Sequence, residues 1–174
     1  MGRLSVIKGL LTITLLGHCL VTLGQQTSSA SQTLTNLPAG AIIEIPLTLN
    51  KDMDLSFGAA LSGSSAGTLT LAASGTATRT VTGGVRLLSD GYVNAARFTV
   101  SGDADRSFSI SFPSSVTIAG PSGASMSLTN FTESSGNVLN GGTNSFYVGA
   151  TLNMNARQRG GSYSGTFSVS VDYN

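Results

Sequence analysis

Apolar and polar residues alternate along most of the chain after residue 40, with the period of two that is typical of a half-buried β-strand. The clearest run is at the C-terminus, where Tyr163, Phe167, Val169, Val171 and Tyr173 share one face and small polar residues share the other. A strand over residues 163–173 is therefore predicted, with its apolar face toward the core.

Shorter alternating runs recur through the middle of the chain and end at turn residues. They lie at Leu69–Leu71, Val85–Leu88, Ala96–Val100, Phe108–Phe112, Val116–Ile118, Met126–Leu128 and Val148–Met154. Pro113 ends one of them, because proline has no N–H to give to a ladder. The glycine-containing stretch Arg157–Ser162 predicts a hairpin into the C-terminal run. Helical spacing is not sustained after residue 24, so an all-β antiparallel sandwich or barrel is predicted.

The stretch Ala41–Leu49 has apolar residues at every odd position, which include Ile43, Ile45 and Leu47. This pattern predicts a strand that is strongly apolar on one face. It has two interpretations, because the stretch follows a polar tail instead of lying between two other strands. It is either the ordinary first strand of the fold or a segment that pairs with another molecule.

The first residues have the pattern of a secretory signal. Arg3 and Lys8 give a positive start, and the mostly apolar run Gly9–Leu23 is too short to span a membrane. Cleavage is expected after Gly24 or, alternatively, after Ala30. A lipoprotein signal using Cys19 is disfavoured, because His18 occupies a position that needs a small residue. The predicted organisation is a signal over residues 1–24 followed by a polar tail over residues 25–40. The protein is expected to be secreted and to have no membrane-spanning segment after the signal is removed.

The charge of the chain excludes two classes of partner. Charged residues make up 10% of the 174 residues, and the formal net charge is +1. Loss of Arg3 and Lys8 with the signal would leave seven basic and eight acidic residues. A net charge so close to zero provides no basis for binding nucleic acid or an acidic membrane surface.

Reactive side chains are scarce. The only His and the only Cys are His18 and Cys19, both within the predicted signal. The string Gly63–Gly67 matches G-x-S-x-G, but Ser65 would have no imidazole to take its proton. Asp103-Ala104-Asp105 begins like a calcium loop and departs from that pattern downstream, so a charged hairpin turn is expected there. We expect no catalytic residues, no metal and no cofactor, and hence not an enzyme.

Several strings resemble, in order and spacing, the bacterial secreted family catalogued as domain of unknown function 4402. They are Asp54–Gly58 (DLSFG), Phe98–Gly102, Ser109–Pro113, Met126–Phe131, Val148–Leu152 and the closing run Gly161–Asn174. The family is similar to spore coat protein U and to archaic chaperone–usher pilus subunits.

The resemblance implies an immunoglobulin-like sandwich over residues 50–174 that lacks one strand and is closed by a donor strand. It places the donor strand at Ala41–Leu49, with Ile43, Ile45, Leu47 and Leu49 as the residues that enter a neighbour's groove. The implied protein is a structural subunit of a bacterial surface fibre or fimbrium, exported through the periplasm. Its implied partners are other copies of itself, a periplasmic chaperone and an outer-membrane usher. The alternative is a self-closed secreted sandwich that acts as a surface coat or adhesive module.

Overall fold

A computed structural model describes residue 41 and residues 43–134 and 136–174. The predicted signal and polar tail lie outside these residues. Every strand pairing in the described part is antiparallel, and the one helical element there is a 3-10 turn at Pro121–Gly123. The all-β antiparallel prediction is confirmed. None of the helices in the described residues is long and apolar enough to cross a membrane.

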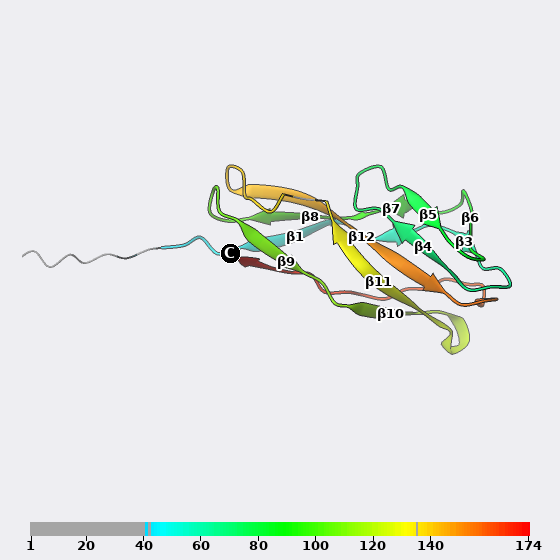
Figure 1. Cartoon of the computed structure of the whole chain (residues 1–174). Coiled ribbons are helices and arrows are strands. Elements are labelled where there is room, and N and C mark those ends of the chain that lie inside the picture. Colours follow the sequence, from blue (N-terminus) through cyan, green and yellow to red (C-terminus); the bar gives the residue numbers. More distant parts are fainter. Residues whose placement is uncertain (1–40, 42, 135) are drawn as a thin grey trace, which may run out of the picture. The chain divides into compact units, whose positions relative to one another are not determined.

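One large sheet contains most of the long strands (Figure 1). Its main path is β1 (Thr48–Met53), β8 (Ala96–Ser101), β12 (Thr143–Met154), β11 (Ser125–Glu133) and β10 (Ser115–Ala119). β12 also pairs with β4 (Gly67–Leu71), which pairs with β5 (Arg79–Val81). β12 is long enough to pair with β8 through residues 143–148 and with β4 through residues 150–154, while β11 covers its other edge.

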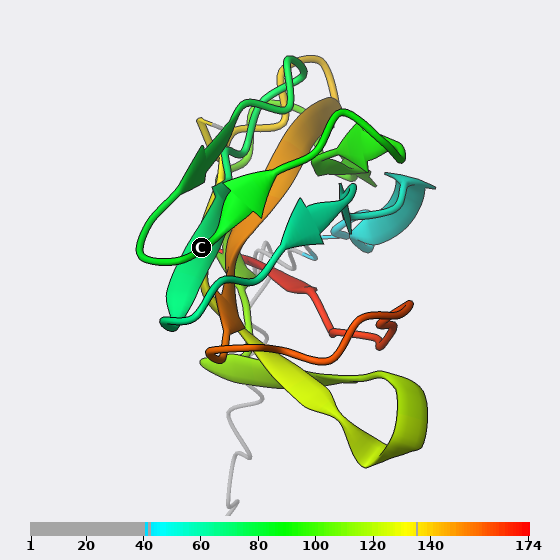
Figure 2. The same cartoon turned by 90° about the vertical axis from the view of Figure 1, so that its right-hand side faces the viewer.

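Three short pairs complete the described fold. They are β13 (Ser170–Tyr173) with β9 (Phe108–Ser111), β2 (Ser56–Phe57) with β7 (Val93–Asn94), and β3 (Ala60–Leu61) with β6 (Arg86–Leu87). Viewed along the strands, the large sheet curls, and the C-terminal segment (red) lies opposite β12 (orange) (Figure 2). This arrangement is consistent with a β-sandwich.

Most of the buried apolar side chains in the described residues form two clusters. The Leu69 cluster contains Leu69, Val85, Ile118, Met126, Leu128, Leu152 and Met154. The Phe146 cluster contains Ala96, Phe98, Val100, Phe108, Leu139, Phe146 and Val148. Phe146 is fully buried and stacks on Phe98 with ring centroids 5.5 Å apart.

Threonine hydroxyls pair between β12 and β4 and between β4 and the residue that follows β5. Thr151 is 8% exposed, and its hydroxyl lies 3.0 Å from that of Thr70 on β4. The hydroxyls of Thr68 and Thr82 are 2.7 Å apart. These pairs satisfy polar groups on the face of the sheet without the use of charge.

The predicted C-terminal strand is wrong in its extent. Its faces alternate as expected, since Phe167, Val169, Val171 and Tyr173 are half-buried while Ser168 and Ser170 are exposed. However, only Ser170–Tyr173 forms a strand. The predicted hairpin across Arg157–Ser162 is also wrong, because β12 pairs with β4, β8 and β11 instead. The chain reverses at Asn155–Gln158 and crosses to the opposite layer, where β9 is the partner of β13.

Two other local predictions need correction. The strand predicted over Ala41–Leu49 begins only at Thr48, since residues 43–47 have no strand partner and Pro46 cannot donate. Asp103–Asp105 does form a turn, with Asp105 at φ 62°, but not a hairpin. The strands on either side of it, β8 and β9, belong to different sheets, so this turn links the two layers.

Candidate functional site: an open apolar groove

The C-terminal segment approaches the large sheet at one point before it reaches β13. Ser164 and Ala119 exchange two main-chain hydrogen bonds of 2.9 Å each. Gly165 makes this approach possible, because a Cβ there would come within 2.9 Å of Ile118 Cγ2. The next residues, Thr166–Val169, take part in no strand pairing of the described fold. A stretch of extended chain with alternating apolar side chains is therefore left without a strand beside it.

A groove of about 1140 Å³ runs beside this segment. One wall is the chain from Leu49 to Ser62, and the other is the C-terminal segment from Gln158 to Val169. The floor consists of members of the Leu69 cluster, namely Leu69, Ile118, Met126, Leu128, Leu152 and Met154. The groove thus opens directly onto the hydrophobic core.

The walls carry half-buried apolar side chains that face the same space. Leu55, Phe57 and Ala60 lie on one side, and Tyr163 and Phe167 lie on the other. Phe167 also contacts Phe131, with ring centroids 5.1 Å apart. Partly exposed apolar side chains therefore line both sides of a groove whose base consists of core residues.

Arg79 holds the first wall in place. Its Nη1 donates to the carbonyl oxygens of Phe57 at 2.9 Å and Ala59 at 3.2 Å. Its Nη2 donates to the carbonyl oxygen of Leu88 at 2.9 Å. One half-buried guanidinium from β5 therefore joins the short pairs β2–β7 and β3–β6 to the large sheet.

A polar network holds the second wall. Gln158 Nε2 donates to the Tyr163 hydroxyl at 2.8 Å and to the carbonyl oxygen of Ser125 at 3.1 Å. The Tyr163 hydroxyl in turn donates to the carbonyl oxygen of Arg159 at 2.7 Å. Tyr163 packs flat against Gly120, where any side chain would overlap its ring. Separate sets of contacts thus fix the positions of the two walls.

The structure divides the four residues expected to enter a neighbour's groove into two pairs. Ile43 is 91% exposed and Ile45 is 57% exposed. Leu47 and Leu49 are half-buried against the Phe146 cluster of their own domain. Leu49 also lines the groove. Whether these residues act as a donor strand stays a prediction.

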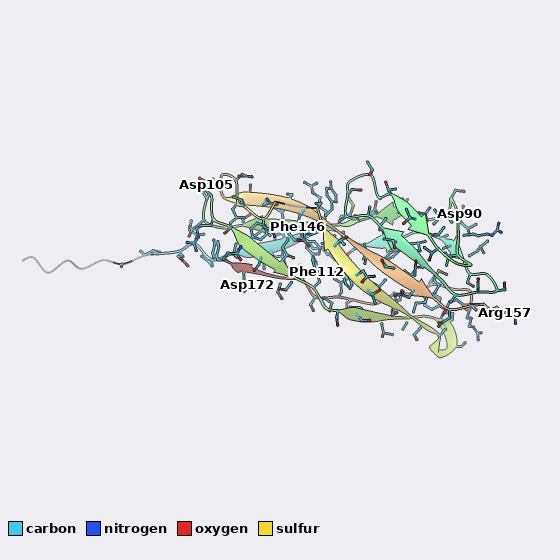
Figure 3. All side chains as sticks on the ribbon, viewed as in Figure 1. Asp90, Asp105, Phe112, Phe146, Arg157 and Asp172 are labelled. Carbon is cyan, nitrogen blue, oxygen red and sulfur yellow. The ribbon has the colours of Figure 1, made fainter. Side chains whose placement is uncertain are left out.

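The segment with Ile43 and Ile45 lies near one end of the unit formed by residues 43–174, and the groove reaches the other end. Figure 3 labels Asp105 and Asp172 at the first end and Asp90 and Arg157 at the second. Glu44 pairs with Arg106, next to Asp105, whereas the groove is lined by Gly91, Tyr92 and Gln158. The exposed apolar segment therefore lies near one end, and the groove extends from Leu49 toward the other end.

The other sequence candidates show no assembled chemistry. Ser65 is exposed in a turn, and the only His of the chain, His18, lies outside the described residues. No group of His, Cys, Asp or Glu side chains within the described ranges could hold a metal ion.

Sequence reasoning did not identify the groove walls as a site. The DLSFG string marks the first wall, since it contains Leu55 and Phe57. The alternation of the C-terminal run marks the second. Neither signal shows that the two walls face each other across a groove. Arg79 has no local signal, because its three acceptors are main-chain carbonyls on other strands.

The described residues define an all-β antiparallel protein with an exposed, core-lined groove. The chain belongs to the family described as domain of unknown function (DUF4402), whose model matches residues 47–173. No curated protein and no solved structure shows a significant match to it.

Proposed function

We propose that this protein is a structural subunit of a bacterial surface fibre, in which a strand from one copy fills the groove of the next. The observation that carries the proposal is the groove itself, whose base consists of core residues and whose two walls share no strand pairing in the described fold. An extended peptide with alternating apolar residues is the kind of ligand that such a groove accommodates.

The N-terminal segment of a second copy is the occupant that the chain itself offers. Ile43 and Ile45 are large apolar side chains left in solvent, and Leu47 and Leu49 continue the same face. Burial of one such side chain contributes about 1.5–3 kcal/mol, so several together would stabilise a joined pair substantially. Main-chain hydrogen bonds to the unpaired edge at Thr166–Val169 would add to this gain.

The positions of segment and groove favour a fibre over a closed dimer. A contact between two different surfaces of the same protein is heterologous, and repeating it gives an open chain of copies unless the rotation closes a ring. Resemblance to pilus subunits and to spore coat protein U supports the same assembly. On that resemblance the chain would be secreted through the periplasm and handled by a chaperone and an outer-membrane usher before it reaches the cell surface.

Paired cysteines test the proposal, because Cys19 is the only native thiol. In a Cys19→Ser background, Ile43→Cys places a thiol on the exposed segment and Thr166→Cys places one on the groove wall. Mild oxidation of the double variant should give a ladder of disulfide-linked multimers on a non-reducing gel. Mixing the two single variants should stop at heterodimers.

Thr117→Cys is the matched control, since Thr117 is exposed on β10 and does not line the groove. Paired with Ile43→Cys, it should give no ladder. A double variant with Thr166→Cys that stays monomeric at every concentration would contradict the fibre proposal. That result would favour the self-closed sandwich.

A further inference from the structure

The chain just before β1 is held to its own domain through both main-chain groups of Ile45. The N–H of Ile45 donates to Asp103 Oδ1 at 3.2 Å. The carbonyl oxygen of Ile45 accepts from the Tyr173 hydroxyl at 2.8 Å. The same hydroxyl accepts from the N–H of Asp103 at 2.7 Å, which ties the segment, the β8–β9 turn and the last strand together.

Arg106 adds a charged contact at the same place. Its Nη1 lies 3.1 Å from Glu44 Oε1, and its guanidinium lies over the Tyr173 ring at 5.0 Å from the centroid. Gly102 leaves the room that this arrangement needs, because a Cβ there would overlap the Tyr173 hydroxyl and lie 3.0 Å from Leu47 Cδ2. We call Asp103, Arg106 and Tyr173 the clamp.

The environment of the chain changes across the clamp. Ile43, on its N-terminal side, is 91% exposed. Leu47, on its C-terminal side, is half-buried against the Phe146 cluster, and β1 begins at the next residue. Pro46 lies between them and has no N–H to place in a ladder. The match to the family model also begins at Leu47.

We propose that the clamp ends the domain at Ile45 and fixes the point from which the upstream chain leaves it, so that only residues before Glu44 enter the groove of a second copy. This inference rests on the proposed function and narrows the donor face. Leu47 and Leu49 stay in their own core. The donated face would be Leu37, Ala39, Ala41 and Ile43, which continue the same alternation in the sequence.

Two physical arguments support this boundary. The single N–H of Ile45 already donates within its own copy, so it cannot also donate to a strand of a neighbouring groove, and the carbonyl oxygen of Ile45 already accepts one hydrogen bond there. A segment whose point of exit is fixed loses less conformational freedom on binding, and its effective concentration at the next copy is higher.

Synthetic peptides test the boundary on dilute, single copies of the full chain. A fluorescent peptide of residues 35–44 should bind the groove, and binding should fall at least about tenfold with Ile43→Asp in the peptide. A peptide of residues 45–53, which contains Leu47 and Leu49, should bind at least about tenfold more weakly than the first. Tighter binding of the second peptide would overturn the proposed boundary.

Amide hydrogen exchange tests the clamp without any assembly. In the full chain, Tyr173→Phe and Asp103→Ala should each speed exchange of the Ile45 amide by about tenfold or more. Tyr147→Phe is the matched control, because Tyr147 lies on β12 beside Arg97 and its hydroxyl makes no hydrogen bond within the described residues, so exchange of the Ile45 amide should not change. Unchanged exchange in both clamp variants would overturn the clamp.

The outcomes separate the two proposals. If neither peptide binds and the paired cysteines give no ladder, the fibre proposal fails. The inference that only residues before Glu44 enter a neighbour's groove then fails with it. If the ladder forms and the Ile45 amide is unprotected in the native chain, the fibre stands and the clamp is wrong.

Discussion

β12 and the C-terminal run have the same alternating pattern in the sequence and very different surroundings in the structure. On β12, Phe146 and Val148 are fully buried and Leu152 is 6% exposed. In the C-terminal run, Phe167 and Val169 remain half-buried. β12 has strand neighbours on both edges, whereas Thr166–Val169 has a strand on neither edge and a groove along one side.

The difference shows that periodicity determines which face of a strand is apolar, while the neighbouring strands determine how much of that face is buried. Side chains of a sheet are covered by the opposite layer and by the strands beside them. Where no strand lies alongside, as at Thr166–Val169 in the described fold, apolar residues with the same period remain partly in solvent.

The largest effect is expected on β12. Phe146→Ala removes a fully buried ring that stacks on Phe98, so it should lower the free energy of unfolding by about 3–5 kcal/mol. Chemical denaturation followed by circular dichroism measures the change. A loss below about 1 kcal/mol would mean that this part of the core is loosely packed.

A Phe→Ala substitution beside the groove should lower the free energy of unfolding by a smaller amount. Phe167→Ala removes a ring that is only half-buried, so the expected loss is about 1–3 kcal/mol in single copies. The loss should increase when the groove is filled by the 35–44 peptide, because the ring would then be covered. Equal losses for Phe167→Ala and Phe146→Ala in single copies would remove the contrast between the two strands.

A smaller effect is expected at the groove wall. Arg79→Met keeps the apolar stem and deprives three carbonyl oxygens of their donor, which should cost about 1–2 kcal/mol. Its effect should be seen first as faster amide exchange at Ala59 and Leu88, whose N–H groups bond to Asp90 and Ala59. Arg86→Met is the control, since Arg86 is exposed on β6.

The smallest effect is expected on the outer face of the C-terminal run. Ser168 is exposed, and Ser168→Ala should change the free energy of unfolding by less than about 0.5 kcal/mol. A larger loss, measured in the same denaturation experiment as for Phe167→Ala, would show that the two faces are assigned the wrong way round.

Local patterns were sufficient to predict most strands. Pro113 correctly ends the run that becomes β9, and the runs around Leu69 and Leu128 become β4 and β11. They were insufficient for pairing, which depends on contacts distant in sequence. The glycines of residues 157–162 indicate a reversal equally well for a hairpin and for a crossing between layers, and the structure has the second.

Of the two surfaces in the proposed contact, only the apolar N-terminal segment could be predicted from the sequence. Ile43 and Ile45 stand out because a β-period apolar face follows a polar tail. The same period continues through Leu47 and Leu49, so the sequence alone places no boundary between them. The boundary in the structure depends on Asp103 and Tyr173, which are 58 and 128 residues away from Ile45 along the chain.

The threonine hydroxyl pairs have a consequence for the solution behaviour of the protein. Thr68 with Thr82 and Thr70 with Thr151 join neighbouring parts of the sheet through neutral groups, and only 10% of the chain is charged. Neutral hydrogen bonds are not screened by dissolved ions, and exposed ion pairs contribute little at any ionic strength. Between low and moderate ionic strength, where salt acts mainly by screening charges, the free energy of unfolding should therefore change little.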